Sequence, residues 1–153
     1  LRLGLGLWPE QLGSLPGFRP IRQLVAARVA PPKLTIVGLG PVLLNILPWI
    51  VEAARVDVFA VSQLPLPGMD GSLMRSVADS RQLLVIEEHV ARGGLGEHVA
   101  AVLAKEGIAF KMYHRHAVGY PNGRYGSQAY HQTQSGLDAV SLKKTVTQLL
   151  GSI

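Results

Sequence analysis

The sequence predicts an α/β fold in which helices cover both faces of a parallel or mixed sheet. Short aliphatic runs of strand length lie at 34–38 (LTIVG), 56–61 (VDVFAV) and 83–88 (LLVIEE). Segments with helical spacing of apolar residues alternate with these runs, as they do when crossover helices join parallel strands. The run at 83–88 is apolar enough to lie at the centre of a sheet that is buried on both faces.

Size and composition agree with one compact domain. The chain has 153 residues, of which 48% are hydrophobic and 16% charged, and it has no cysteine. That composition allows a substantial core and excludes disulfides and thiolate chemistry. No apolar run reaches the roughly 18 residues that a membrane span needs. The first residues, LRLGLGLW, lack the features of a signal peptide, so we expect a cytoplasmic protein without a membrane partner.

The net charge of +5 does not indicate a nucleic-acid partner. The charges are scattered along the sequence, the longest basic run is Lys143-Lys144, and no arginine stripe alternates with aromatic residues. An anionic substrate or an ordinary solvated surface fits this pattern better. We therefore predict no nucleic-acid binding.

The N-terminal third predicts an arm, an edge strand and a helix. Residues 1–23 begin with Leu rather than Met and are rich in glycine and proline, so we expect a linker or arm from a preceding domain of a longer protein. The run at 24–30 (LVAARVA) predicts an edge strand. A proline suits the first turn of a helix over 41–54, which Pro48 should kink or shorten.

The middle of the chain predicts two helices separated by a central strand. Prolines exclude a helix over 64–71, and Asp70 or Ser72 can cap a short helix after them. A second helix follows the glycine cluster at 93–96 and ends at Gly107. The apolar face of this second helix consists of Leu95, Val99, Val102 and Leu103.

The C-terminal third predicts a further strand and two helices. The strand is expected at 108–114 (IAFKMYH), and a polar loop at 117–126 follows it. A short helix is expected at 127–134, and Ser141 can cap the last helix. The apolar stripe of the last helix consists of Leu142, Val146, Leu149 and Leu150.

Gly38-Leu39-Gly40 lies between a strand and a helix, as the start of a dinucleotide-binding fingerprint does. The third glycine of that motif should fall at position 43, which is Leu43, and no acidic residue ends the next strand at 61–63. We therefore interpret the pair of glycines as a turn that lets the strand enter a helix.

Glu87, Glu88 and His89 follow the central strand at its carboxyl end, where open α/β sheets bind ligands. Successive strand residues point to opposite faces, so the two carboxylates should not act as a pair. No further residue at a suitable spacing completes a metal site. His114 and His116 share one face of an extended segment, but the sequence assigns them no partner. Chemistry and an interface role both stay open for these histidines.

Four segments together carry a more specific pattern. Its most specific parts are Glu87 followed by a Gly-Gly-Leu-Gly run at 93–96, and Gly126-Ser127 followed by Gly-Leu-Asp at 136–138. The segments are LTIVGLG (34–40), VDVFAVSQLPLP (56–67), SRQLLVIEEHVARGGLGEHVAAVLAKEGI (80–108) and RYGSQAYHQTQSGLDAVSL (124–142). They resemble the C-terminal domain of transketolase-like, thiamine-diphosphate-dependent enzymes over roughly residues 24–150. That group includes transketolase, 1-deoxyxylulose-5-phosphate synthase and the β subunits of 2-oxo acid dehydrogenase E1 components.

The resemblance implies a three-layer α/β/α sandwich with a mixed five-stranded sheet and one antiparallel edge strand. The segment at 24–30 would be that edge strand, residues 24–153 the domain, and residues 1–23 the linker from a pyrimidine-binding domain. The resemblance also implies that the parent enzyme holds thiamine diphosphate and Mg²⁺ between its pyrimidine- and pyrophosphate-binding domains. This chain alone would bind no cofactor and no metal and would supply no catalytic residue.

The implied function is a non-catalytic assembly domain of a homodimeric transketolase-type transferase, which moves a two-carbon ketol unit between sugar phosphates. A fragment of a 2-oxo acid dehydrogenase E1 β subunit and a free-standing regulatory or interaction module are the alternatives.

Two departures leave the subfamily open. Gly68-Met69-Asp70 stands where the family often has a Lys-Pro-Leu-Asp turn, and the loop YHRHAVGYPNGRYG is unusually basic and aromatic.

We expect the stretch EEHVARGGLG to be an interface element rather than an active site. Gly93 and Gly94 allow a tight reversal, and the amides at the following helix start would attract Glu87, Glu88 or a neighbour's carboxylate. A second hypothesis is that positive charge around the polar loop attracts phosphorylated substrate; its residues are His114, Arg115, His116 and Arg124. The candidate interface or substrate-channel residues are Glu87, Glu88, His89, Arg92, Gly93, Gly94, His114, His116 and Arg124.

Overall fold

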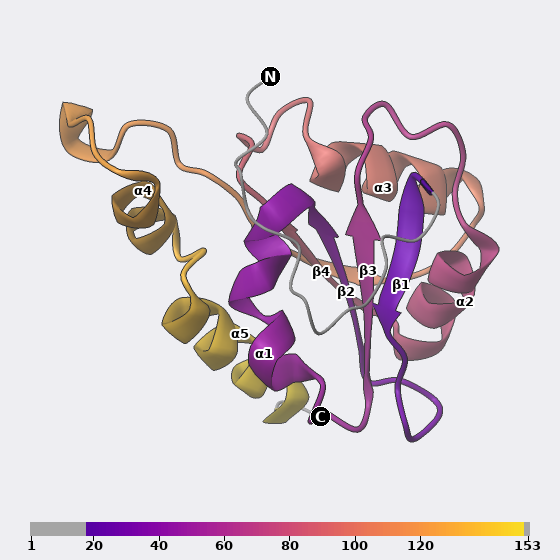
Figure 1. The fold of residues 1–153 in the computed structure, drawn as a ribbon. Helices are drawn as coiled ribbons and strands as arrows, with labels where there is room; N and C mark the ends of the chain where they lie inside the picture. Colours follow the sequence, from indigo (N-terminus) through magenta and orange to yellow (C-terminus); the bar gives the residue numbers. More distant parts are fainter. Residues whose placement is uncertain (1–17, 152–153) are drawn as a thin grey trace.

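The computed structural model describes residues 18–151, and it contains one five-stranded sheet in the order β1-β3-β2-β4-β5 (Figure 1). Strands β3, β2, β4 and β5 are parallel to one another, and β1 pairs with β3 antiparallel at the edge. This confirms the mixed sheet with one antiparallel edge strand. The strands are β1 Ile21–Val25, β2 Leu34–Leu39, β3 Val56–Val61, β4 Gln82–Glu87 and β5 Lys111–Arg115.

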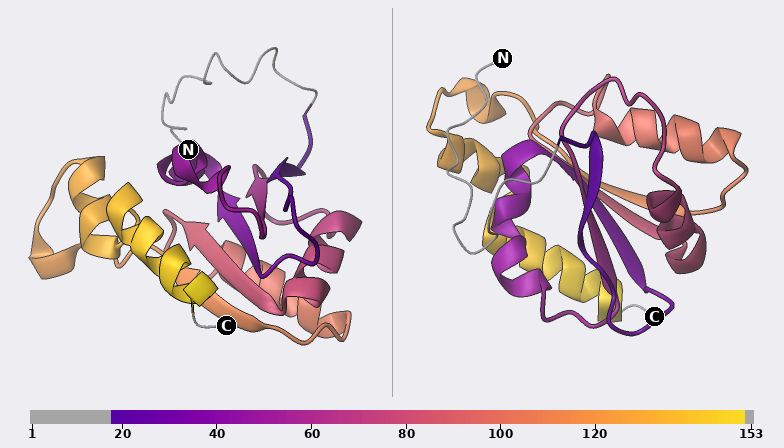
Figure 2. Two further views of the ribbon diagram at one scale, coloured as in Figure 1. Left: turned by 90° about the horizontal axis from the view of Figure 1, so that it is seen from below. Right: turned by 45° about the vertical axis from the view of Figure 1, so that its right-hand side comes forward.

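Helices cover both faces of the sheet, so the predicted three-layer α/β/α architecture is confirmed. The α2 and α3 helices pack on one face, while η2, α1 and α5 pack on the other (Figure 1, Figure 2). The helical segments are η2 Gly40–Asn45, α1 Leu47–Ile50, α2 Gly71–Ser80, α3 Leu95–Lys105, η3 Pro121–Gly123, α4 Gln128–Ser135 and α5 Ala139–Gly151. Within the described residues, no helix has the length and apolar character that crossing a membrane requires.

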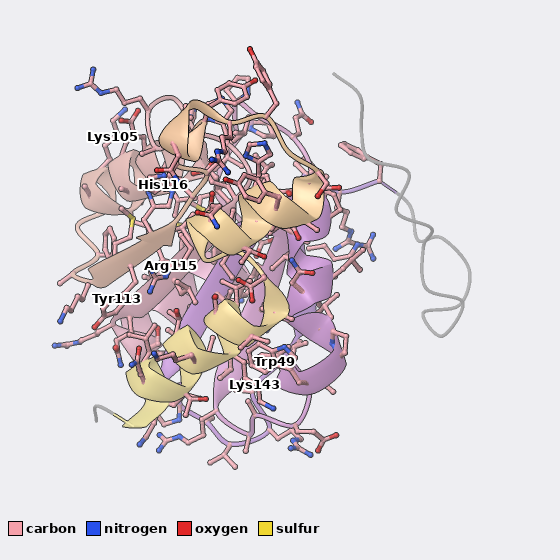
Figure 3. The ribbon with its side chains drawn as sticks, turned by 90° about the vertical axis from the view of Figure 1, so that its left-hand side faces the viewer. Trp49, Lys105, Tyr113, Arg115, His116 and Lys143 are labelled. Carbon is pink, nitrogen blue, oxygen red and sulfur yellow. The ribbon has the colours of Figure 1, made fainter. Side chains whose placement is uncertain are left out.

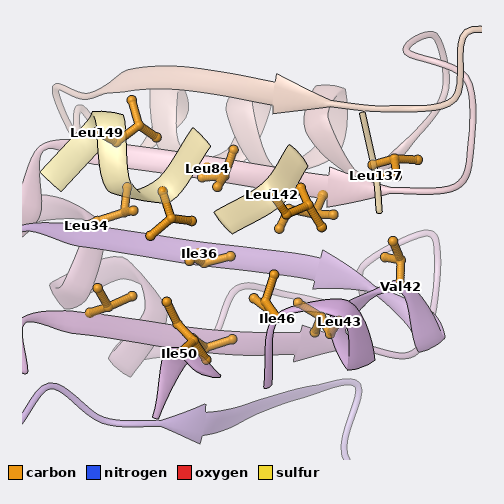
Figure 4. Close-up of a cluster of buried hydrophobic side chains, with 14 residues drawn as sticks. Leu34, Ile36, Val42, Leu43, Ile46, Ile50, Leu84, Leu137, Leu142 and Leu149 are labelled. Carbon is orange, nitrogen blue, oxygen red and sulfur yellow. The ribbon is translucent and has the colours of Figure 1, made fainter. Parts of the chain in front are cut away.

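Alternating side chains of the central strands fill two cores. On β2, Ile36 faces the core under α1 and α5, while Val37 faces the core under α2 and α3. On β4, Leu84 and Val85 divide in the same way (Figure 4 shows the core under α1 and α5). All four side chains are fully buried. Burying each one contributes about 1.5–3 kcal/mol, which explains why these strands are apolar throughout.

Two N-terminal predictions were wrong in their bounds. The edge strand is Ile21–Val25 rather than 24–30, and the amide of Ala27 donates to the Asp57 carboxylate (2.7 Å) instead of joining the sheet. The expected helix at 41–54 is a 3-10 segment followed by a single helical turn that ends at Ile50. Pro48 stands in the first turn of α1, so the proline shortened the helix as expected. Residues 1–17 of the predicted arm lie outside the described residues, and the domain boundary stays a prediction.

Other bounds shifted by a few residues. The central strand ends at Glu87, one residue earlier than predicted. The last strand begins at Lys111 rather than at 108, because Ile108 and Phe110 pack against the core under α2 and α3 before the chain pairs with β4. Asp70 caps α2 as expected, accepting from the amides of Ser72 and Leu73.

The last helix is capped by Asp138, not by Ser141 as predicted. Asp138 Oδ1 accepts hydrogen bonds from the amides of Val140 (3.1 Å) and Ser141 (3.0 Å). The Ser141 side chain and these amides lower the pKa of Asp138, because they favour the ionised carboxylate. The carboxylate also lies at the positive end of the helix, so it stabilises the start of α5.

Replacing Asp138 with alanine should lower the free energy of unfolding by about 1 kcal/mol and Tm by roughly 3 °C near pH 7. Because the pKa is lowered in the folded state, this stabilisation is present above the unfolded pKa of about 3.9 and is lost as the pH falls through the folded pKa. Thermal unfolding at pH 7 and pH 3 should therefore show a smaller Tm difference at pH 3. Asp79→Ala, at an exposed position of α2, is the control and should change little. An equal loss at both pH values would contradict capping by the ionised carboxylate.

Candidate functional site

Glu87 is fully buried at the carboxyl end of β4, although it is charged. Its Oε2 accepts the amide of Leu95 (2.8 Å), and its Oε1 accepts the amide of Gly96 (3.0 Å). Both amides belong to the first turn of α3 and lack a partner within the helix. Of the carboxylates considered from the sequence, Glu87 is therefore the one that accepts hydrogen bonds from this helix start.

His114 supplies a third hydrogen bond to the same carboxylate. In the β4–β5 ladder His114 pairs with Val85, so its side chain lies on the face that Glu87, two residues later, also uses. His114 Nε2 lies 2.8 Å from Glu87 Oε1, and with Glu87 ionised this nitrogen is the donor. The ring of His116 lies 4.7 Å from the ring of His114, between centroids, so the shared face of these two histidines is confirmed.

The glycines of the cluster allow these contacts. A Cβ at Gly94 would lie 2.3 Å from Glu87 Oε2, and a Cβ at Gly96 would lie 2.6 Å from His114 Cε1. Gly93 has the positive φ of 71° that the reversal requires. The prediction that a glycine allows the tight reversal is correct for Gly93. At Gly94 a side chain is absent for another reason, because the Glu87 carboxylate approaches the backbone there.

The start of α3 is already occupied by groups of this chain. Glu97 Oε2 accepts the amide of Gly93 (2.8 Å), in addition to the two amides bound by Glu87. Helix starts at the carboxyl ends of parallel strands are the usual anion sites of such folds. Here a buried carboxylate stands in that place, and removing its partners would cost about 3–5 kcal/mol. Chemically, the arrangement fixes β4, α3 and β5 together.

Glu88 points to the opposite side and contacts α4. It accepts hydrogen bonds from the side-chain amides of Gln128 (3.0 Å) and Gln132 (2.8 Å). Gln132 also accepts a hydrogen bond from Asn45 of η2, at 3.2 Å. The expectation that Glu87 and Glu88 would not act as a pair is confirmed. The sequence interpretation missed both glutamines, although their i, i+4 spacing places them on one face of α4.

The other predicted site residues lie at the surface and outside this cluster. His89 and Arg92 are exposed in the connection between β4 and α3, together with Val90. The imidazole Nδ1 of His89 contacts the carbonyl of Val90 at 2.8 Å. Arg124 is exposed in the loop before α4, and its guanidinium makes no ion pair with the part of the chain that the structure describes.

The loop at 117–127, which we call the aromatic loop, projects away from the sheet beside α4 (Figure 1, Figure 2). Tyr125 is 89% exposed and Tyr120 is 67% exposed, and their rings contact each other at 5.2 Å between centroids. Tyr120 also contacts His131 of α4. A Cβ at Gly126 would lie 2.3 Å from the Tyr130 ring, so this glycine lets the loop approach α4 closely. These contacts hold a largely exposed aromatic surface in one conformation.

The glycine turn after β2 does not form a nucleotide site. A Cβ at Gly38 would lie 2.5 Å from the side chain of Leu43, which therefore covers the turn. Gly40 has a positive φ of 73°, which lets the strand enter η2. Between residues 18 and 151, no three His, Asp or Glu side chains gather where they could hold a metal ion.

Sequence comparison decides the family. Residues 25–141 match the family described as transketolase, C-terminal domain. The chain belongs to the transketolase C-terminal domain family. This match covers the last residue of β1, the other four strands, the Glu87 cluster and the aromatic loop.

Curated relatives of this transketolase C-terminal domain are much longer proteins. The 1-deoxy-D-xylulose-5-phosphate synthase of Myxococcus xanthus is 30% identical over 152 residues, which cover 93% of this chain and 24% of that protein. The 1-deoxy-D-xylulose-5-phosphate synthase of Thioalkalivibrio sulfidiphilus is 31% identical over 112 residues, which cover 71% of this chain and 17% of that protein. The chain thus spans about a quarter or less of these relatives.

A solved structure supports the fold. A split-gene transketolase, described as an inactive β4 tetramer, superposes with a TM-score of 0.64 at 24% identity. The superposition covers 88% of this chain and 44% of that one. At this identity the similarity is one of fold.

Gly94→Ala should destabilise the fold by about 3–5 kcal/mol, because its Cβ would displace the buried Glu87 carboxylate from the α3 amides. The backbone of Gly94 is extended, so the change adds little strain of its own. Gly68→Ala is the matched control, since a Cβ there meets nothing within 4 Å. Urea unfolding of both variants measures the difference. Similar midpoints for the two variants would show that the close approach of Glu87 is not stabilising.

Proposed function

We propose that this chain is the non-catalytic assembly domain of a thiamine-diphosphate-dependent transferase of the transketolase type, which moves a two-carbon ketol unit between sugar phosphates. The observation that carries the proposal is the buried carboxylate of Glu87 at the start of α3. It fills the place where an open α/β sheet would otherwise bind an anionic ligand. Because the named relatives are 1-deoxy-D-xylulose-5-phosphate synthases, a synthase of that kind is the second candidate for the parent enzyme.

The residues of this domain do not fit thiamine diphosphate or Mg²⁺. The diphosphate would need free amides or cations at a helix start, and those of α3 are bound to Glu87 and Glu97. Mg²⁺ would need several oxygen ligands, and no such group forms among residues 18–151. We therefore derive no reaction step through this chain. In our proposal the pyrimidine- and pyrophosphate-binding domains of a cytoplasmic, homodimeric parent hold both groups.

The aromatic loop is the surface that best fits an assembly role. Tyrosine is enriched at the centres of protein interfaces, because its ring buries a large area and its hydroxyl can bond a partner. Exposed apolar surface next to the cation of Arg124 fits a partner domain with an apolar recess and an acidic rim. The exposed residues His89, Val90 and Arg92 offer a second contact at the same end of the sheet.

The proposed interface or substrate-channel roles divide among the candidate residues. Glu87, Gly93, Gly94 and His114 shape the interface from within, because they fix the loop and the helix start. The surface members would contact the partner or guide phosphorylated substrate; they are Glu88, His89, Arg92, His116 and Arg124. His114 has one ring nitrogen bound to Glu87, so its part in any attraction of substrate would be indirect.

Glu87→Gln in the full-length enzyme should weaken dimerisation and lower Tm while leaving kcat per assembled dimer within about tenfold, less than the loss of a general acid or base costs. The glutamine side chain can lie in two orientations. In either one its NH₂ group faces the backbone N–H of Leu95 or of Gly96, so two donors meet where the carboxylate had accepted a hydrogen bond. Glu97→Gln is the control, because its side-chain oxygen can still accept the Gly93 amide. Sedimentation and steady-state kinetics measure both effects. A fall in kcat of a thousandfold with intact dimers would make Glu87 catalytic and refute the proposal.

Tyr125→Ser should raise the dissociation constant of the assembled enzyme by about tenfold or more, as the loss of an interface tyrosine commonly does. Val140→Ser is the matched control, because Val140 is also strongly exposed (79%) but lies on α5, outside the aromatic loop. Analytical ultracentrifugation over a range of concentrations measures both constants. Equal dissociation constants for the two variants would exclude the aromatic loop from the interface.

A further inference from the structure

Nearly all of the excess positive charge lies in the last third of the chain. Residues 107–153 contain five Lys and Arg against one Asp, and therefore hold +4 of the total charge of +5. This segment forms β5, the aromatic loop, α4 and α5, which lie together at one side of the molecule (Figure 1, Figure 2). These basic residues are divided among β5, the aromatic loop and α5, and Arg115 of β5 is the one that lines a cavity.

A cavity of about 300 Å³ lies between β5 and α5 within this basic region. Its lining combines one guanidinium, two hydroxyl groups, one amide and one aliphatic side chain with part of His114, whose imidazole lies on the other face of the sheet against Glu87, and it includes no acidic residue. The lining residues are Tyr113, His114, Arg115, Thr145, Gln148 and Leu149. Figure 3 shows Tyr113 and Arg115 side by side on this side of the molecule. The volume is at the lower end of the range for small-molecule sites.

Arg115 is held in position at this cavity. Its Nη2 donates to Thr145 Oγ1 (3.1 Å), and Thr145 in turn donates to the carbonyl of Ser141 (3.0 Å). No carboxylate of the described residues pairs with this guanidinium. Because a guanidinium has five N–H donors in one plane, most of them stay available for an oxyanion. Thr145 thus fixes the cation without neutralising it.

The neighbouring side chains favour an anion attached to a small body. Lys111 Nζ lies 5.2 Å from the centre of the Tyr113 ring, so a second cation lies beside one of the lining residues. Lys144 precedes Gln148 by four residues on α5, so the two lie on the same side of the helix. The Tyr113 ring and Leu149 provide an apolar wall. We propose that this cavity binds a small phosphate ester, with its phosphate on Arg115 and its body against Tyr113 and Leu149. The proposal does not depend on the assembly role of the domain.

NMR titration of the full 153-residue chain at constant ionic strength tests this site, with inorganic phosphate and phenyl phosphate as probes. Saturable shifts are expected at Arg115 Nε–H, the Thr145 amide and the Gln148 side-chain amide. Phenyl phosphate should bind more tightly than inorganic phosphate, because its ring can contact the apolar wall. Arg115→Gln should raise the Kd for phenyl phosphate by about tenfold or more, since hydrogen bonds to charged groups are strong.

Lys143→Gln is the matched control. It also removes one positive charge, but Lys143 of α5 lies near Trp49, away from Arg115 of β5 (Figure 3), so the Kd should change by less than about twofold. Gln148→Glu is a second variant at an exposed position; its carboxylate should abolish binding while the amide spectrum stays that of the folded chain. Absence of saturable shifts, or equal losses in Arg115→Gln and Lys143→Gln, would overturn the site. Equal affinity for the two probes would overturn the assignment to an ester.

Discussion

The buried carboxylate of Glu87 is the constraint on which one end of this fold depends. A charge without solvent is tolerated only when several donors surround it, and Glu87 has two helix amides and one imidazole. The three donors restrict two elements: the two amides fix the start of α3, and His114 fixes β5 against β4. The absence of side chains at Gly94 and Gly96 follows from the same requirement, because both positions touch this cluster.

The sequence predicted the elements whose pattern is local. The strands β2, β3 and β4 are continuous apolar runs, because both of their faces are buried, and α3 has a clear apolar stripe. The bound of the edge strand depends on a contact distant in sequence, because the strand ends early where the amide of Ala27 bonds the Asp57 carboxylate, thirty residues away. The cap of α5 is a different case, since Asp138 lies only two and three residues before the amides that it binds. A local pattern was present there, and the sequence interpretation chose the wrong residue of it.

The same division applies to the candidate site. Glu87 could be predicted to bind the start of α3, because a carboxylate, a glycine turn and a helix follow one another in the sequence. Its bond to His114 could not, since that pair depends on the register between β4 and β5. The cavity beside Arg115 is still less visible, because its walls come from β5 and from α5, which begins more than twenty residues later. The sequence did show an excess of positive charge, but only the fold places Arg115 beside a cavity.

The distribution of acids and bases explains how this excess arises without a nucleic-acid motif. Several carboxylates are used as internal acceptors: Glu87 and Asp57 are buried, and Asp138 caps a helix. Arg115 and Arg124, by contrast, keep their charge without an acidic partner among the described residues. A surface whose acids are directed inward and whose cations remain unpaired attracts anionic groups from outside. The proposed assembly surface and the proposed phosphate cavity therefore share one physical origin, in which carboxylates stabilise the domain from within and guanidiniums stay available at its surface.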